Sequence, residues 1–250
     1  MKINDNIARH NYNRDMNMYE KEIFSRRPEG IRPGGLELTG YLVESCGFSA
    51  GARIVDAGCG TGISMDYISG KYGFDVTGID LSRILLNKGH ERSPGLRLIN
   101  ASGGCLPFRD HSVDGVLCEC AMSAMHDKKG LLREINRILA EGGRLAVSDV
   151  YIRRPEYAGM VRYIPLKGCI TGAMTYNELI KELADAGFRI LLWEDRSDTW
   201  KSFIAKLIMD NGSLCEVLKC DSLSAEFSVP MLATAGKAKP GYYCMIAEKK

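Results

Sequence analysis

The stretch IVDAGCGTG, residues 54–62, is the one around which we expect the rest of this chain to be built. Two β-branched residues lead into an acid, Asp56, and three glycines follow at a spacing of two before a helical segment begins. Glycines in such a loop allow a positive φ and let the backbone come close to a ligand. The N–H groups at the start of the next helix face the same point. The stretch therefore predicts a strand, a tight ligand-binding loop and a helix.

The spacing of the glycines distinguishes two classes of cofactor. A dinucleotide loop places its third glycine three residues after the second, so that a pyrophosphate can sit on the helix N-terminus. That position is Ile63 here, which disfavours a nucleotide-binding dehydrogenase. The carboxylate of Asp56 suits a ligand with an ammonium group. DAGCGTG resembles the first motif of the class I S-adenosylmethionine-dependent methyltransferases. The resemblance implies S-adenosylmethionine as cofactor and a Rossmann-like α/β fold with a doubly wound, mostly parallel sheet.

Length and composition limit the other classes of function. The chain has 250 residues, of which 45% are hydrophobic, enough for one substantial core. Its net charge of +2 gives no strong field toward nucleic acid or anionic membrane. No apolar run reaches the roughly 18 residues of a membrane span, and the N-terminus lacks an apolar signal core. We expect a cytoplasmic protein that acts on a small-molecule substrate.

The nine cysteines are scattered and include no CxxC pair. This pattern predicts neither a disulfide framework nor a thiolate zinc site, and we expect no bound metal. Most of the cysteines are expected to be small buried hydrophobic residues.

Three segments are predicted along the chain. Residues 1–35 are polar and show no period over most of their length, which indicates an N-terminal arm or lid, or a disordered segment without function. Residues 36–196 and 240–250 alternate strand and helix patterns and form the predicted methyltransferase domain. Residues 197–239 carry helical stripes and are too long for a hairpin loop. We expect this insertion before the last strand to be a cap over the substrate or a homodimer surface.

Local signals predict the individual elements. A capping box, Thr175 with Glu178 three residues on, starts one helix. Period two in the fourth strand predicts that Cys118 and Cys120 share one face, with Glu119 on the other. The predicted strands are 54–56, 74–80, 96–100, 113–120, 144–150, 189–195 and 241–250, and the predicted helices are 36–46, 64–71, 82–92, 126–142 and 176–187.

The carboxyl ends of parallel strands meet at one edge of the sheet, so residues that follow them are expected to bind the cofactor. Asp80 would accept hydrogen bonds from the ribose hydroxyls, or else cap the helix from Leu81. Ser102 stands where the resembling family has an acid or amide that binds the adenine amino group, and a neutral hydroxyl makes the weaker bond. The predicted cofactor-binding residues are Asp56, Gly58, Cys59, Gly60, Gly62, Asp80, Leu81, Ser102, Gly103 and Glu119.

Methyl transfer needs an aligned nucleophile, and a base only when a hydroxyl or amine must lose a proton. His126, just after the fourth strand, is the candidate base for an O, N or C acceptor. It could equally be a surface residue that caps the next helix. Cys120 and Cys169 follow the fourth and fifth strands, so two thiols are expected to face one pocket.

Two segments resemble one subgroup of the methyltransferases. CAMSAMHDKKGLLREINRILAEGGRLAVSDVY and GCITGAMTYNEL are similar to two segments of the arsenite methyltransferases, each of which carries an arsenic-binding cysteine. The resemblance implies that Cys120 and Cys169 bind a soft acceptor such as trivalent arsenic, although a further cysteine of that subgroup is Gly34 here. Two alternatives stay open: an ordinary metabolite acceptor with packing cysteines, and a non-catalytic cofactor-binding protein on the same fold.

Overall fold

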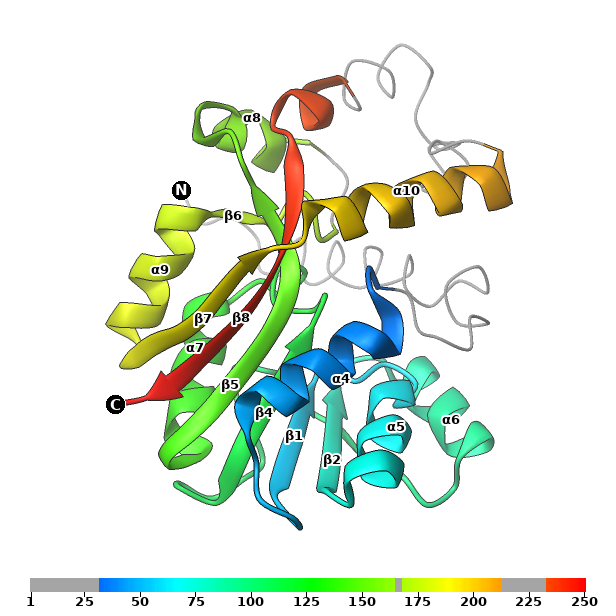
Figure 1. The fold of residues 1–250 in the computed structure, drawn as a ribbon, viewed down its shortest axis with the longest axis vertical. Helices are drawn as coiled ribbons and strands as arrows, with labels where there is room; N and C mark the ends of the chain where they lie inside the picture. The colour runs from blue at the N-terminus through cyan, green and yellow to red at the C-terminus, as the bar shows by residue number, and fades with distance from the viewer. Residues whose placement is uncertain (1–31, 165–167, 213–232) are drawn as a thin grey trace, which may run out of the picture.

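The computed structural model describes residues 32–164, 168–212 and 233–250, whose centre is one twisted sheet (Figure 1). The strand order is β3-β2-β1-β4-β5-β8-β7, and a short β6 pairs with β5. The strands are β1 Arg53–Ala57, β2 Asp75–Asp80, β3 Arg97–Asn100, β4 Val113–Glu119, β5 Leu139–Ile152, β6 Met174–Thr175, β7 Phe188–Asp195 and β8 Pro240–Lys249. β8 runs antiparallel to β5 and β7, and the other pairs are parallel. The predicted doubly wound, mostly parallel sheet is confirmed.

Helices cover both faces of this sheet (Figure 1). They are α4 Gly35–Cys46, α5 Ile63–Tyr72, α6 Arg83–Arg92, α7 Lys128–Ile138, α8 Ala158–Arg162 after the 3₁₀ turn η1 Pro155–Tyr157, α9 Tyr176–Asp185 and α10 Ser197–Asn211. Leu42 of α4 and Met65 of α5 belong to one buried cluster, and Leu131 of α7 and Leu183 of α9 belong to a second. Alternate residues of each central strand enter the two clusters, as period two requires.

The boundary between α7 and β5 differs from the prediction. The helix was expected to continue to Gly142, but it ends at Ile138. Leu139 takes an extended conformation, with φ −66° and ψ 136°, and begins β5. Leu139 pairs with Val113, and the register shifts before Gly115 pairs with Arg144. Because Leu139 is buried in either arrangement, hydrophobic periodicity alone could not locate the end of the helix.

The predicted face of Cys120 is wrong. Strand β4 ends at Glu119, and Cys120 has a φ of 51°, which is uncommon for a residue with a Cβ. Cys118 lies in the cluster below α7 as expected. Cys120 instead packs against the cluster on the α4 side, which also contains Leu117. The left-handed turn thus directs the Cys120 thiol to the other face of the sheet.

The predicted insertion begins with a helix that packs on the domain. α10 starts at Ser197, and its Trp200 is buried and stacks on Tyr242 of β8 with a centroid distance of 6.4 Å. Residues 1–31, most of the predicted arm or lid, and 213–232, with the second helical stripe of the insertion, lie outside the described residues. Among the helices of the described ranges, none is long and apolar enough to cross a membrane.

Candidate functional site

The glycine loop after β1 is tightly packed except at its middle glycine. Gly58, Gly60 and Gly62 have φ values of 87°, 55° and 74°. A Cβ on Gly58 would lie 2.4 Å from Ala121 Cβ, and one on Gly62 would lie 2.7 Å from Leu96 Cδ1. A Cβ on Gly60 would meet nothing within 4 Å. The outer glycines are therefore required by packing, and Gly60 presents backbone to an open space.

Asp80 ties this loop to the end of β2. Its Oδ2 accepts from the Gly60 N–H at 2.9 Å, and its Oδ1 accepts from the Ser82 N–H at 2.8 Å. Ser82, whose Oγ accepts from the Leu85 N–H, is the N-cap of α6. The role of helix cap therefore belongs to Ser82. The half-buried Asp80 carboxylate lies beside the open face of Gly60.

Asp56, at the end of β1, is a buried carboxylate with an unpaired oxygen. It is 2% exposed, and its Oδ2 accepts no hydrogen bond within the described part of the chain. Burial, with the nearby Glu119 carboxylate, raises the pKa of Asp56 to about 7, while Arg32 acts in the opposite direction. A buried polar atom normally has a partner, so this oxygen fits a cationic ligand group.

Glu119, at the end of β4, is a second buried carboxylate close to Asp56. Its carboxylate accepts from the Thr39 hydroxyl at 3.0 Å and the Ser64 hydroxyl at 3.2 Å, and it lies 3.1 Å from Arg32 Nε. Sequence reasoning missed Arg32, Thr39 and Ser64. Arg32 stands in a polar stretch without a period, and the two hydroxyl residues look like ordinary helix residues. Only the fold brings them to Glu119.

The loop after β3 carries two of the predicted residues. Ser102 is exposed, and its Oγ accepts from the Gly104 N–H at 3.3 Å. A Cβ on Gly103 would lie 2.8 Å from Leu131 Cδ1, so glycine is required there for packing on α7. Asn100, which the sequence did not single out, donates to the backbone carbonyls of Asp80 and Leu81 at 3.0 and 2.9 Å. It thereby joins the ends of β3 and β2.

Two further predicted residues differ in exposure. Leu81, after β2, is 38% exposed. Cys59 is buried, its N–H donates to the Ile79 carbonyl, and its Sγ would lie 2.7 Å from a Cβ on Gly78. The Cys59 side chain therefore packs against β2, and burial raises the pKa of its thiol.

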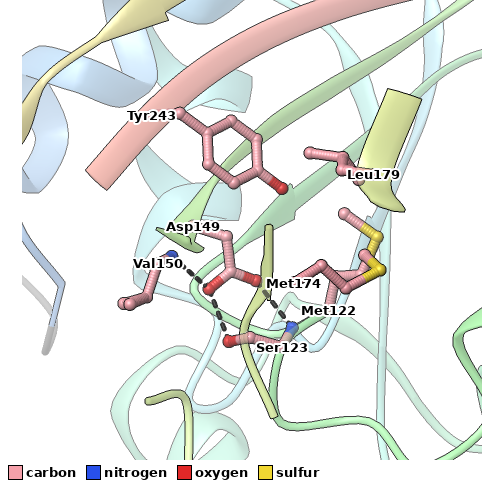
Figure 2. A pocket seen from close by; sticks show the side chains of 7 residues that line it. All are labelled: Met122, Ser123, Asp149, Val150, Met174, Leu179 and Tyr243. Atoms are coloured by element: carbon pink, nitrogen blue, oxygen red, sulfur yellow. Dashed lines mark hydrogen bonds between the residues drawn. The ribbon is translucent and has the colours of Figure 1, made fainter. Parts of the chain in front are cut away.

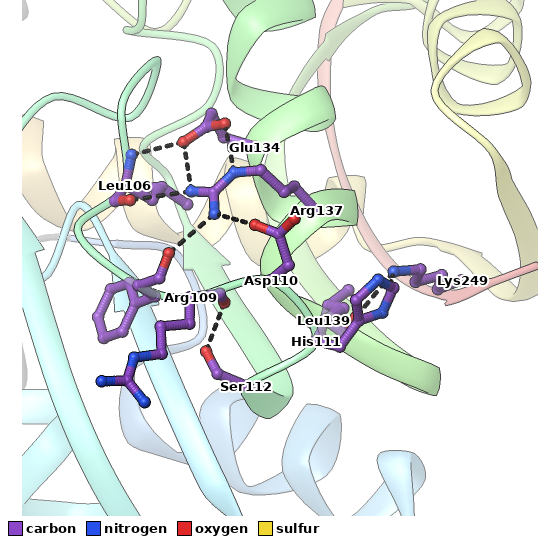
Figure 3. Close-up of polar contacts among 10 residues, drawn as sticks. Leu106, Arg109, Asp110, His111, Ser112, Glu134, Arg137, Leu139 and Lys249 are labelled. Carbon is purple, nitrogen blue, oxygen red and sulfur yellow. Dashed lines mark hydrogen bonds and ion pairs between the residues drawn. The ribbon is translucent and has the colours of Figure 1, made fainter.

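Arg137 of α7 fixes the rest of the loop after β3 (Figure 3). Its guanidinium donates to the Leu106 and Phe108 carbonyls at 3.0 and 2.8 Å, to Asp110 at 2.7 Å and to Glu134 at 2.8 Å. Glu134 also accepts from the Leu106 N–H at 2.8 Å. The planar fork of arginine is needed for this set of partners.

Arg137→Lys should therefore lower the free energy of unfolding by about 2 kcal/mol, since one ammonium group cannot reach all these partners. Arg133→Lys, on the exposed side of the same helix, is the matched control and should change stability by less than about 0.5 kcal/mol. Urea unfolding of both variants measures the difference. Equal stabilities would show that the network contributes little.

The two candidate thiols lie together on the α4 side of the sheet. Cys120 and Cys169 are half-buried and hydrogen bonded to each other. This hydrogen bond, with burial, raises the pKa of Cys120 well above its usual range. The Cys120 N–H donates to the Ser148 carbonyl at 2.7 Å, and the buried Tyr242 hydroxyl donates to Ser148 Oγ at 3.1 Å. The thiols therefore share one half-buried environment on the α4 side of the sheet.

His126 is exposed in the turn before α7. The cap of α7 is the next residue, Asp127, which accepts from the Gly130 N–H at 2.8 Å. Within the described ranges, no group of three or more His, Cys, Asp or Glu residues could hold a metal ion.

The chain matches known proteins over the same elements. Residues 55–147 match a family model described as a methyltransferase domain. Phosphoethanolamine N-methyltransferase 1 of Arabidopsis thaliana is 30% identical over 183 residues, 70% of this chain and 36% of the relative. An arsenite methyltransferase of Halobacterium salinarum is 30% identical over 147 residues, 55% of this chain and 37% of the relative. The chain thus matches little more than a third of the length of either.

A solved structure agrees with the fold. The phosphoethanolamine N-methyltransferase 2 of Haemonchus contortus, in complex with phosphomonomethylethanolamine and S-adenosylhomocysteine, superposes with a TM-score of 0.70. The match covers 94% of this chain and 57% of that chain, at 17% identity. At this identity the likeness bears on the fold alone.

Proposed function

Because residues 55–147 form a methyltransferase domain of the class I S-adenosylmethionine-dependent type, we propose that the protein transfers a methyl group from that cofactor to a small-molecule acceptor. The observation that carries the proposal is the buried Asp56 carboxylate, one oxygen of which has no hydrogen-bond partner among the described residues. Asp56 precedes the loop in which Gly60 presents its backbone to open space. S-Adenosylmethionine supplies a methyl group on a positively charged sulfur, activated for direct transfer. Three carboxylates at the ends of β1, β2 and β4 suit such a cation.

Each of these carboxylates has a separate task in this proposal. Asp80 would accept hydrogen bonds from the ribose hydroxyls, because its carboxylate stands at the end of β2 beside the exposed backbone of Gly60, which it already binds. Asp56 would pair with the ammonium group, which removes the cost of an unpaired buried polar atom. Glu119 would add negative potential at the same place, held by Arg32, Thr39 and Ser64.

We further propose that the acceptor is a soft, thiol-reactive centre, represented by trivalent arsenic. Cys120 and Cys169 would each form a bond to it, and each thiol would lose its proton to a departing hydroxyl as water. Thiolates prefer soft centres, and a centre with its own lone pair needs no base. The exposed position of His126 agrees with a reaction in which no base takes part. The Halobacterium relative, named as an arsenite methyltransferase, supports this class.

The phosphoethanolamine relatives make a nitrogen acceptor the competing candidate. One experiment separates the candidates: release of S-adenosylhomocysteine is followed with arsenite and a thiol reductant, and separately with phosphoethanolamine. We expect release with arsenite only. Release with phosphoethanolamine alone would end the soft-acceptor proposal. Binding of S-adenosylmethionine without turnover on either acceptor would favour a non-catalytic binding protein.

Cofactor affinity should rise with pH through the titration of Asp56. The pKa of this acid is raised to about 7 without ligand, and a cationic ligand favours the ionised form. Binding below pH 7 must therefore release a proton, and affinity should be about tenfold lower at pH 6 than at pH 7.5. Calorimetry in buffers of different ionisation enthalpy measures both quantities.

Two variants control this pH experiment. Asp56→Asn cannot titrate, so its affinity should be nearly independent of pH in this range. Asp198→Asn, at a side chain that is 94% exposed on α10, should keep the parent profile. A parent affinity that does not change between pH 6 and 7.5 would remove Asp56 from the cofactor site.

A further inference from the structure

The turn that follows Cys120 is hydrogen bonded to a buried acid, Asp149 (Figure 2). Asp149 of β5 is 1% exposed. Its carboxylate accepts from the Ser123 N–H at 2.7 Å, from Ser123 Oγ at 2.5 Å and from the Val150 N–H at 2.7 Å. Hydrogen bonds to an ionised acceptor are among the strongest in proteins. The backbone of Ser123 is therefore fixed to the sheet.

The loop that carries Cys169 rests directly on this fixed turn. A Cβ on Gly172 would lie 1.9 Å from the Ser123 carbonyl oxygen and 3.1 Å from its carbonyl carbon. Gly172 is not among the glycines with positive φ, so an L-residue could adopt its backbone conformation. Glycine is required here only because a side chain would clash. The clashing atoms are the carbonyl oxygen and carbon of Ser123, whose backbone Asp149 holds.

The loop is constrained on its own side as well. The Gly172 N–H donates to the Gly168 carbonyl at 3.1 Å. Thr171 Oγ1 lies 3.1 Å from both the N–H and the carbonyl oxygen of Gly168. Met174 then pairs with Tyr151 of β5. The contacts with Gly168 preserve the shape of the loop, and the pairing of Met174 ties its end to β5, so an added methyl group on Gly172 is expected to push the loop away from Ser123 as a unit.

From this packing we infer that Gly172 is a positioning residue, which brings Cys169 into contact with Cys120 so that one soft centre can bind both thiols. The inference rests on the proposed function of the thiol pair. Cys120 contributes from its side through its left-handed turn and the bond of its N–H to Ser148. Gly172→Ala should leave both thiols present but too far apart, or wrongly oriented, to bind one centre.

Phenylarsine oxide is a suitable probe because it needs two thiols. Its arsenic forms one bond to each sulfur, the two thiol protons leave with the oxygen as water, and nothing is oxidised or reduced. Two tethered thiols bind such a centre more tightly than one, on the order of 100-fold. Cys120→Ser gives the background from single thiols and from the other cysteines. The affinity of the full chain for phenylarsine oxide is measured by titration under reducing conditions. Intact mass measurements monitor the binding.

The parent and Gly159→Ala should bind one equivalent well above the Cys120→Ser background. Gly159 lies in α8, and a Cβ there meets nothing within 4 Å, so this variant controls for an added methyl group. Gly172→Ala should fall to the background, a loss on the order of 100-fold. Its affinity for S-adenosylmethionine and the reaction of its single thiols with iodoacetamide should not decrease. Both readouts separate positioning from a general loss of structure.

Parent-like binding of phenylarsine oxide by folded Gly172→Ala would overturn the inference, and the thiol-pair proposal would stand. If the parent itself bound no better than Cys120→Ser, the thiol-pair proposal would fail and the inference with it. If Gly172→Ala does not fold, Thr171→Val decides, since it loosens the same loop without added bulk. It should weaken binding about fivefold, and an unchanged affinity would contradict the role of the loop.

Discussion

Replacement of Cys120 or Cys169 by serine is expected to lower the rate of methyl transfer to arsenite at least 100-fold, or about 2.7 kcal/mol in transition-state stabilisation. Serine keeps the size of the side chain, but its hard oxygen binds a soft centre poorly. Affinity for S-adenosylmethionine should stay within about twofold, because the carboxylates of β1, β2 and β4 are untouched. Initial rates of methylated arsenic formation measure the effect.

Cys105→Ser is the matched control for these variants. Cys105 is exposed in the loop after β3, and its loss should leave the rate unchanged. Arsenite methylation that survives in the double variant Cys120→Ser/Cys169→Ser would end the role proposed for the thiols. The two residues would then be packing residues beside a different acceptor site.

The second large effect is expected at Asp80, where alanine should weaken S-adenosylmethionine binding about 100-fold. The substitution removes the acceptor proposed for the ribose hydroxyls. It also leaves the N–H groups of Gly60 and Ser82 without their carboxylate, so the glycine loop loses its link to β2. Calorimetric titration of the cofactor measures the loss.

Asp75→Ala controls for removal of a carboxylate from the same strand. Asp75 begins β2, is exposed and forms an ion pair with Arg97 at the surface, so its loss should leave cofactor affinity unchanged. Asp80→Asn keeps the size and one acceptor oxygen, and should fall between the parent and Asp80→Ala. Parent-like binding by Asp80→Ala would show that this carboxylate does not hold the ribose.

Much of the fold could be predicted because local signals and the global fold agree. DAGCGTG predicts β1, its loop and α5, and the two tightly packed glycines of that loop, Gly58 and Gly62, are required by Ala121 and Leu96. The capping box of Thr175 and Glu178 is confirmed, with both of its hydrogen bonds present. These features depend either on residues that are neighbours in the chain or on the rule that the carboxyl ends of parallel strands meet at one edge of the sheet.

The errors arose where two arrangements bury the same residues. Leu139 is buried as the first residue of β5, as it would be at the end of a longer helix. At Cys120, a single left-handed residue ends the alternation of β4 and changes the face of the thiol. No composition or period signals that turn, because the residue is not glycine.

The residues that sequence reasoning missed act through contacts between distant segments. Arg32, just before α4, meets Glu119 at the end of β4, Arg137 binds a loop about 30 residues earlier, and Gly172 is required only by the carbonyl of Ser123. Each looks ordinary in sequence. For Arg137 and Gly172 the available hints were a charged residue on the polar side of a predicted helix and a glycine in an irregular loop, and neither indicates a partner.

The proposed reaction is methyl transfer from S-adenosylmethionine to a centre held by two thiols. The most direct measurement incubates the purified protein with arsenite, a thiol reductant and the cofactor labelled in its methyl group, then separates the arsenic species and counts the label. We expect labelled methylated arsenic, with one equivalent of S-adenosylhomocysteine for each methyl group transferred. Bound cofactor with no labelled arsenic product would contradict it.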